Sequence, residues 1–466
     1  MTVARTNPSP PQSKVESVDD RSDRVAVIGA GTSGLTAVKN LLEHGVRVDC
    51  FERESDLGGN WNAALPCSRV IDSTHLISSK QLTEYLDHPM PKAWPEYPSH
   101  RLVLEYLQSY ADRFALREHL EFNSGVRRVE PIDANGDERG WLVELESGER
   151  RRYGRLLIAN GHNWDHSFPA WSGRVGESAF GGVELHSGEY KSPQELLGKR
   201  VLVVGGGNSG CDIAVESSQH AKATRLSLRR GYHFLPKFFH GTPIDVCGER
   251  MLWCRVPLAL RRFLAHGMIF LMLGTREGTG LPRPDHRLFE AHPVVTSTLV
   301  YHLRHGDLAV RPDVESLTET GVRFVDGREE AYDVIVYATG YRLTFPFIDN
   351  EHLNWRDGRP RLHLNVFHPQ RDDLFVIGMM QPDSGSWGLA DRQARLVAQY
   401  LIASEQGTAA ARKFDAARAA DSRPKGSIRY LKTDRHLIEV EHSSYRSRVD
   451  RAWKRLRRGV RQSVNA

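Results

Sequence analysis

The 466-residue sequence predicts an α/β fold that contains two β-α-β units. In the first unit, the apolar stretch 24–28 precedes a glycine cluster, a helical stretch 35–44 and a second apolar stretch 46–52. The same order returns between residues 200 and 228. Because a strand that returns to its sheet through a helix runs parallel to the first strand, we expect two parallel sheets. Two further buried strands are expected, at residues 333–337 and 374–377.

The first glycine cluster has the features of a dinucleotide site. Gly29 permits a tight turn, Gly31 lets the backbone approach a diphosphate, and Gly34 lets the helix pack close to the strand. Glu52 ends the next strand, where a carboxylate accepts hydrogen bonds from a ribose 2′-hydroxyl. The alternative is a purely structural β-α turn. The candidate contacts are Gly29, Gly31, Thr32, Ser33, Gly34, Glu52 and Arg53.

The second glycine cluster predicts a different dinucleotide. No acid stands where Glu52 stands in the first unit, and Arg229 and Arg230 occupy that place. Guanidinium groups suit a 2′-phosphate, which a carboxylate would repel. The alternative is a solvated surface pair. The candidate NADP contacts are Gly205, Gly207, Asn208, Ser209, Gly210, Arg229 and Arg230. FAD at the first site, reduced by NADPH at the second, is the natural pairing.

Charge and cysteine content exclude several classes of protein. The net charge is +5, but residues 446–461 alone carry eight Lys/Arg and one Asp, so the main body is nearly neutral and no nucleic-acid partner is indicated. The five cysteines include no CxxC pair, which argues against a disulfide framework, a redox-active pair or a metal site and favours a cytoplasmic location. The longest apolar run, residues 263–274, is too short to span a membrane and predicts a buried or interfacial helix.

A motif between the two units indicates a family. Residues 180–190 fit the pattern FxGxxxHxxxY through Phe180, Gly182, His186 and Tyr190. This stretch resembles the identifying motif of the class B flavin-containing monooxygenases, which use FAD and NADPH. Four shorter matches occur in the expected order, and the resemblance covers residues 24–401: GGNW at 58–61, FLPK at 234–237, YATGY at 337–341 and QP at 381–382.

The resemblance implies a reaction. NADPH would reduce FAD, and reduced flavin with O₂ would form a C4a-(hydro)peroxyflavin that oxygenates a nucleophilic nitrogen or sulfur of a small molecule, as in N,N-dimethylaniline monooxygenases. Baeyer-Villiger oxygenation of a ketone is an alternative, although that class usually has Trp in place of Tyr190. The remaining alternatives are a poorly coupled NADPH oxidase that releases H₂O₂ and a non-enzymatic sensor.

The resemblance also extends the candidate site. It implies FAD contacts at Gly59, Asn60, Trp61 and Gln381 and NADP contacts at Thr339 and Gly340. It leaves His186 with two roles, a structural one at the domain junction or direct contact with the reduced site. The three catalytic candidates are Ile77, Ser78 and His186.

One position departs from the family pattern. Aligning residues 78–81 on the family's Ser-x-Lys-Glu stretch places Ile77 where animal and yeast-type members have an Asn that helps hold the oxygenated flavin and NADP⁺. Isoleucine cannot donate a hydrogen bond. We expect Ser78 or the backbone to supply the missing contact, and a drier pocket to compensate further.

The expected domain organisation follows the motifs. Residues 1–22 form a disordered leader, 23–165 and 336–441 a discontinuous FAD-binding domain, 166–335 an inserted NADPH-binding domain, and 442–466 a basic amphipathic tail. Both domains are expected to be Rossmann-like. Val449, Trp453, Leu456 and Val460 share one helical face of the tail. That face would contact an anionic membrane weakly, dock on the protein's own body or a partner subunit, or fray. A homodimer is left open.

Overall fold

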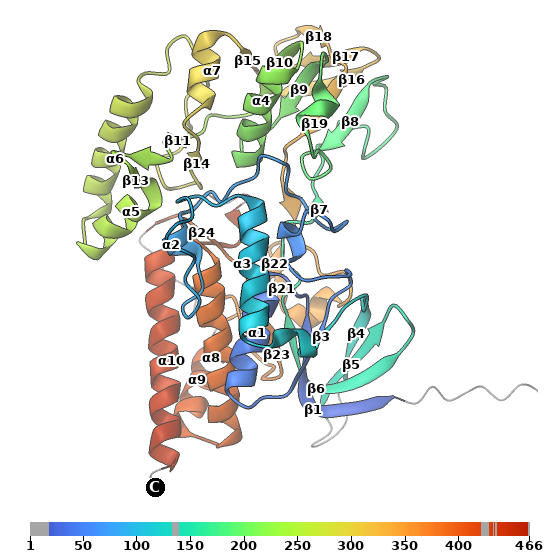
Figure 1. Ribbon diagram of the computed structural model, residues 1–466, viewed down its shortest axis with the longest axis vertical. Coiled ribbons are helices and arrows are strands. Elements are labelled where there is room, and N and C mark those ends of the chain that lie inside the picture. The colour runs from blue at the N-terminus through green and yellow to red at the C-terminus, as the bar shows by residue number, and fades with distance from the viewer. Residues whose placement is uncertain (1–17, 133–138, 421–427, 432, 434–435, 465–466) are drawn as a thin grey trace, which may run out of the picture.

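The computed structural model describes residues 18–132, 139–420, 428–431, 433 and 436–464 (Figure 1). Two sheets dominate it, and the second lies above the first in the view of Figure 1. The predicted α/β class with two Rossmann-like units is confirmed.

The first sheet has a parallel core and an antiparallel edge. β1 lies between β2 and β6 and runs parallel to both, and β23 runs parallel to the end of β6. β5 pairs with the start of β6, and β4 pairs with β5, both antiparallel. The strands are β1 (Asp19–Ile28), β2 (Val48–Phe51), β3 (Leu120–Glu121), β4 (Val126–Ile132), β5 (Gly140–Leu145), β6 (Arg150–Ile158) and β23 (Leu374–Val376).

The second sheet is parallel throughout and has the order β15-β10-β9-β19-β8. Its inner strands are buried on both faces, as the continuous apolar runs at residues 200–204 and 333–337 predict. The strands are β8 (Val183–His186), β9 (Arg200–Val204), β10 (Ala223–Ser227), β15 (Leu308–Arg311) and β19 (Val334–Tyr337). An antiparallel sheet follows, of β16 (Val314–Thr318), β17 (Gly321–Phe324) and β18 (Glu329–Ala331).

Helices cover the sheets and extend to one side of them (Figure 1). They are α1 (Thr32–Glu43), α2 (Lys80–Thr83), α3 (His100–Arg113), α4 (Asn208–His220), α5 (Ile244–Trp253), α6 (Leu258–Leu273), α7 (Leu299–His305), α8 (Trp387–Glu405), α9 (Ala409–Ala419) and α10 (His442–Val464). The short 3₁₀ helices are η1 (Gly59–Trp61), η2 (Leu116–His119), η3 (Pro193–Leu196) and η4 (Asn350–Leu353).

Several two-residue strands pair between loops. They are β7 (Asp165–His166) with β20 (Tyr341–Arg342), β11 (Phe234–Leu235) with β14 (Val294–Val295), β12 (Phe238–Phe239) with β13 (Thr242–Pro243), β21 (Trp355–Arg356) with β22 (Arg359–Pro360), and β24 (Gln381–Pro382) with β25 (Glu439–Val440). The β7–β20 pair matters most, because it joins the chain leaving the first sheet to the chain returning to it.

Two expected boundaries differ from the strands. β1 begins at Asp19, so residues 19–22 belong to the sheet and not to the expected leader 1–22; the rest of that leader, up to residue 17, lies outside the described residues. The reason is a cross-strand ion pair, since Arg21 lies 2.8 Å from Asp49 of β2. The expected domain boundary between residues 335 and 336 falls inside β19, which pairs along its whole length with β8 and β9. Sheet membership therefore extends the inserted unit to Tyr337.

The basic tail docks on the body of the protein. Val449 and Leu456 are fully buried in the core that α1 and α8 share, and Trp453 and Val460 pack against it. The apolar face of α10 is therefore covered within the chain, and membrane contact through this face, one of the alternatives for the tail, is wrong. Residues 465–466 of the tail lie outside the described part of the chain.

The apolar run at residues 263–274 forms most of α6. Only one side of this helix is buried, so the expectation of a buried helix is wrong, and the interfacial alternative stays a prediction. Within the described residues, no helix is long and apolar enough to cross a bilayer.

The docking of α10 predicts a stability effect. Leu456→Ala should lower the free energy of unfolding by about 2–5 kcal/mol, because it leaves a cavity between α10 and the helices beneath it. Lys454→Ala, on the exposed side of α10, should change it by less than about 0.5 kcal/mol. Thermal denaturation of both variants measures the difference. Equal melting temperatures would contradict the docked position of α10.

Candidate functional site

One cavity opens at the carboxyl ends of both sheets and has a volume of about 1550 Å³. The loops that line it follow β1, β6 and β23 in the first sheet and β9, β10 and β19 in the second. Ligands of open parallel sheets bind at this edge. A site for one small ligand usually measures about 300–1,000 Å³, so this cavity has room for more than one.

The two glycine turns at this edge have the same geometry. Gly29 and Gly205 have φ values of +100° and +112°, which favour glycine. A Cβ atom on Gly34 would lie 1.7 Å from the Gly29 carbonyl oxygen, and one on Gly210 would lie 1.9 Å from the Gly205 carbonyl oxygen. Each helix therefore packs directly on its own turn, as the sequence predicts.

This packing leaves two helix N-termini facing the cavity. The N-cap residues of α1 and α4 are Gly31 and Gly207, and neither helix has a side-chain cap. The first N–H groups of each helix are thus available to an anion. A Cβ atom on Gly31 would approach no chain atom closer than Gly59 Cα, at 3.9 Å. This open space fits the diphosphate of a dinucleotide.

The acidic residue after β2 is fixed beside the first turn. Glu52 is buried, and its carboxylate accepts hydrogen bonds from the backbone N–H groups of Ala30 at 2.7 Å and Glu54 at 3.0 Å. Burial raises the pKa of Glu52, while the two N–H donors oppose that shift. Its position on the cavity wall fits a ribose hydroxyl.

The second turn has cations in the corresponding place. Arg229 is exposed, and the Arg230 guanidinium lies 5.8 Å from the centre of the Tyr232 ring. Both line the cavity, and neither guanidinium hydrogen bonds to another residue of the described chain. The pair is therefore available to a phosphate group.

The structure brings nearly all predicted site residues to this one cavity. Only the helix-packing Gly34 and Gly210 and the buried His186 lie outside its wall. The predicted residues that line it are Gly29, Gly31, Thr32, Ser33, Glu52, Arg53, Gly59, Asn60, Trp61, Ile77, Ser78, Gly205, Gly207, Asn208, Ser209, Arg229, Arg230, Thr339, Gly340 and Gln381.

His186 lies behind the cavity wall. Its Nδ1 accepts a hydrogen bond from the Gly188 N–H at 3.1 Å, so its Nε2 donates to the Gly340 carbonyl oxygen at 3.0 Å. Burial lowers its pKa to about 4, so the ring is neutral at neutral pH. The ring stacks on His166 at 4.0 Å, between the two linkers of the inserted unit. This position fits the structural role at the junction and does not fit direct contact with the reduced site.

The Ser78 hydroxyl already donates a hydrogen bond within the protein. The Thr83 hydroxyl donates to the Ser79 carbonyl oxygen, so the Ser78 hydroxyl must donate to Thr83 Oγ1, at 2.9 Å. Ser78 therefore presents only acceptor lone pairs to the cavity. The expectation that it replaces the missing Asn as a donor does not fit this geometry. Ile77 lies on the wall and presents an apolar side chain where the family pattern has an Asn.

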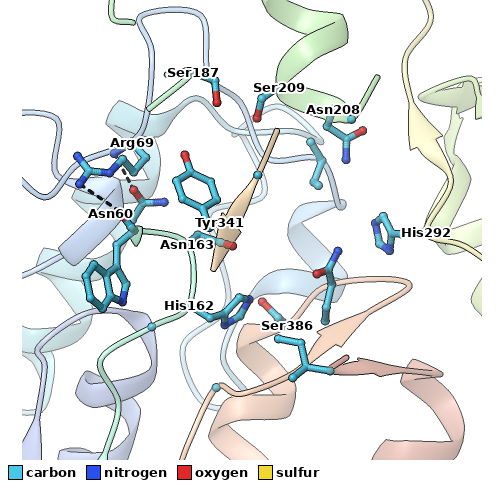
Figure 2. A pocket seen from close by; sticks show the side chains of 18 of the residues that line it. Asn60, Arg69, His162, Asn163, Ser187, Asn208, Ser209, His292, Tyr341 and Ser386 are labelled. Atoms are coloured by element: carbon cyan, nitrogen blue, oxygen red, sulfur yellow. Dashed lines mark hydrogen bonds between the residues drawn. The ribbon is translucent and has the colours of Figure 1, made fainter. Parts of the chain in front are cut away.

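The loop after β6 was missed at the sequence level. Asn160, His162 and Asn163 line the cavity, and Figure 2 shows His162 and Asn163 between Asn60 on one side and Asn208 on the other. Burial lowers the pKa of His162 to about 4. The available signal was the sequence IANG at residues 158–161, which repeats the strand-ending pattern of YATG at 337–340.

Arg69 and Asp245 of α5 also line the cavity, and sequence reasoning missed both. The Arg69 guanidinium donates to the carbonyl oxygens of Pro66, Ser68 and Trp164, and the residue lies on the cavity wall beside Asn60 (Figure 2). On the opposite side, Asp245 of α5 accepts the Ser79 N–H at 2.6 Å. This bond ties the loop that carries Ile77 to the inserted unit.

Comparison with known proteins identifies the family of this chain. The family described as "Flavin-binding monooxygenase-like" matches residues 22–441. The chain belongs to this family. It is 33% identical over 437 residues to mouse (Mus musculus) "Flavin-containing monooxygenase 5", covering 90% of this chain and 80% of that protein. It is 32% identical over 390 residues to "Dimethylaniline monooxygenase [N-oxide-forming] 2" of Rattus norvegicus, covering 80% and 72%.

Solved structures share the fold at lower identity. An oxidized steroid monooxygenase bound to NADP has a TM-score of 0.70 at 18% identity, covering 94% of this chain and 99% of that one. S-allyl-L-cysteine S-oxygenase from Allium sativum has a TM-score of 0.63 at 19% identity, covering 93% and 89%. The family resemblance in the motifs is confirmed, and the enzyme is an NADPH-dependent FAD monooxygenase.

The open space at Gly31 predicts a selective loss of FAD. Gly31→Val should fold, because a Cβ atom there lies no closer than 3.9 Å to any chain atom, yet it should purify colourless because the valine occupies the space of the diphosphate. Gly34→Val, whose Cβ would clash with backbone, should fail to fold. Circular dichroism and the flavin absorbance of the purified proteins distinguish the two. A folded Gly31→Val protein with full FAD content would refute the first site.

The free arginines predict the coenzyme preference. Changing Arg229 and Arg230 together to Ala should weaken the preference for NADPH over NADH by about 10- to 100-fold, since a hydrogen bond to a charged group contributes about 1.5–3 kcal/mol. Arg328→Ala, an exposed arginine away from the cavity, serves as the control. The measurement is kcat/KM for flavin reduction with each coenzyme. A wild type that uses NADH equally well would show that these arginines do not select.

Proposed function

We propose that this enzyme transfers one oxygen atom from O₂ to a nucleophilic nitrogen or sulfur of a small molecule. The balance is substrate, O₂, NADPH and H⁺ giving the oxygenated substrate, NADP⁺ and water. The observation that supports this most strongly is that the uncapped N-termini of α1 and α4 open on one cavity. A hydride donor and its acceptor held there would meet without leaving the protein.

The residues of each half would hold one cofactor. For FAD, the α1 N-terminus would bind the diphosphate and Glu52 the ribose, with Asn60, Trp61 and Gln381 farther along the wall. For NADPH, the α4 N-terminus would bind the diphosphate and Arg229 and Arg230 the 2′-phosphate. The bound flavin supplies the redox and oxygen-transfer chemistry.

The acceptor requires little further chemistry from the protein. An amine nitrogen or a sulfide sulfur brings its own lone pair, so no general base is needed to activate it. The protein orients it and excludes water. Ile77 and, from α5, Ile244, Met251 and Leu252 line the same cavity and supply apolar surface for this purpose.

Two other reactions are distinguished by product. A ketone acceptor would give an ester, and a poorly coupled oxidase would return the electrons of NADPH as H₂O₂. The resemblance implies that the ketone-oxygenating class usually has Trp in place of Tyr190. Tyr190 is fully buried here, and its hydroxyl donates to Glu216 at 2.5 Å. It therefore acts through packing and not through contact with the acceptor.

The proposal is tested by following NADPH, O₂ and products together. With N,N-dimethylaniline or a methyl aryl sulfide, the product should gain the mass of one oxygen atom, and the product formed should approach the NADPH consumed. The same assay with cyclohexanone should give little lactone. H₂O₂ equal to the NADPH consumed with every acceptor would refute the monooxygenase reaction for these substrates.

Ile77 predicts how well the reaction is coupled. Because the Ser78 hydroxyl does not donate into the cavity, the backbone and the exclusion of water by Ile77 are the contributions that remain. Ile77→Asn should raise the fraction of NADPH electrons released as H₂O₂ at least about twofold, since it replaces the apolar side chain that excludes water. Ser78→Ala should change that fraction little. A peroxidase-coupled assay measures it in both variants. A lower fraction in Ile77→Asn would show that the missing hydrogen bond matters more than dryness.

A further inference from the structure

His292 lines the cavity, and the proposed function assigns it no role. It lies on the loop that leads into β14, where the Val295 N–H donates to the Asn208 side chain at 3.0 Å. Asn208 begins α4, and Figure 2 shows Asn208 and His292 on the same side of the cavity. The loop that carries His292 is therefore fixed beside the predicted NADP site.

A carboxylate stands behind His292. His292 Nδ1 and Glu439 Oε2 lie 3.9 Å apart, both atoms are enclosed, and neither has a hydrogen-bond partner among the described residues. Glu439 belongs to β25, and Gln381, a predicted FAD contact, stands opposite it on β24. The pair thus joins a loop beside one dinucleotide site to a strand beside the other.

The carboxylate of Glu439 is held in place and ionised. His436 Nδ1 donates to Glu439 Oε1 at 3.0 Å, and only 1% of the Glu439 side chain is exposed. Burial alone would raise the pKa of Glu439, yet that pKa is lowered, because the imidazoles of His292 and His436 lie beside it. A small rotation of the His292 ring brings Nδ1 within hydrogen-bond distance of Oε2, and catalytic hydrogen bonds are often long before a substrate binds.

This arrangement makes Nε2 of His292 a proton acceptor. A carboxylate that accepts the Nδ1 hydrogen fixes the tautomer in which Nε2 carries a lone pair, and it stabilises the imidazolium once Nε2 takes up a proton. No hydrogen bond from another described residue occupies Nε2, and the ring lies on the cavity wall. A base is therefore available to a molecule bound in the cavity.

Asp383 is a second ionisable side chain on this part of the wall. Burial raises its pKa, and its Oδ1 accepts the His442 N–H at 2.8 Å. Tyr430 is neutral, because burial raises its pKa. Other ionisable groups of this region are paired with one another: Glu249 with His442 and Arg446, Arg261 with Glu441, and Arg262 with Glu290. Asp383 is therefore the competing proton acceptor that an experiment must separate from His292.

We propose that His292, oriented by Glu439, accepts the proton of an ammonium ion, and that the substrates of this enzyme are aliphatic amines that arrive protonated. The inference rests on the proposed oxygenation. A protonated amine has no lone pair to oxygenate. The N–H bond breaks, its electron pair stays on nitrogen, and the proton moves to Nε2 of His292. The imidazolium returns this proton to the water that the reaction forms, so ammonium, O₂ and NADPH give amine oxide, NADP⁺ and water.

The test compares N,N-dimethylbenzylamine, a cation at neutral pH, with benzyl methyl sulfide, which has a similar shape and no proton to lose. In the wild type, the ratio of kcat/KM for the amine to that for the sulfide should change less than about threefold between about pH 7 and 8.5. In His292→Gln, the ratio should be at least about tenfold lower at pH 7 and should rise about tenfold per pH unit, because only the neutral amine then reacts. Glu439→Gln should lower the ratio in the same direction.

Matched controls separate this role from a structural one. N,N-dimethylaniline, which is neutral at pH 7, should show neither effect of His292→Gln. His305→Gln, an exposed histidine on α7 away from the cavity, and Asp383→Asn should both keep the pH-independent ratio. Flavin absorbance and melting temperature check that each variant folds.

Three outcomes would overturn the inference: a wild-type ratio that rises tenfold per pH unit, a His292→Gln ratio equal to that of the wild type, or a steep profile in Asp383→Asn alone. If neither the amine nor the sulfide is oxygenated, the proposed function itself is wrong, and the inference falls with it.

Discussion

The site depends on the contact that α1 and α4 each make with the glycine turn that precedes them. Gly34 and Gly210 have no side chain, so the first turn of α1 and of α4 lies against the carbonyl oxygen of the glycine that follows the preceding strand. Any Cβ there would push the helix away from the strand. With the helix close to the turn, its free N–H groups point across the end of the strand, and an anion-binding site exists before any ligand arrives. Both halves of the protein repeat this solution.

A second set of contacts makes two such sites share one cavity. The two linkers of the inserted unit pair as β7 and β20, and His186 bonds to the Gly340 carbonyl oxygen beside them. On the other side of the cavity, Ser79 donates to Asp245. These contacts hold the carboxyl edges of both sheets toward one cavity. Two dinucleotides bound there would lie near each other, as hydride transfer requires.

The sequence predicted the two β-α-β units well because their constraints are local. A turn with positive φ at Gly29, close packing at Gly34 and a carboxylate at Glu52 all lie within one short stretch. Most of the residues predicted for the site line one cavity, since the carboxyl ends of parallel strands meet at one edge.

What the sequence could not predict depends on distant parts of the chain. The loop at Asn160 to Asn163 reaches the cavity only because β6 lies between β1 and β23, which are far away in sequence. The hydrogen bond that the Ser78 hydroxyl donates depends on the rotamer of Thr83. The burial of the apolar face of α10 depends on its packing against α8. The exposed side of α6 is the opposite case, because periodicity shows an apolar helix and only the tertiary structure shows which side is left uncovered.

The central claim is that the two dinucleotides meet in one cavity, and anaerobic reduction of the bound flavin tests it most directly. NADPH deuterated at the transferring position of C4 should bleach the oxidised-flavin absorbance without release of FAD, more slowly than unlabelled NADPH does. One equivalent should suffice. Flavin that stays oxidised under these conditions, or that is reduced only after it leaves the protein, would contradict the account.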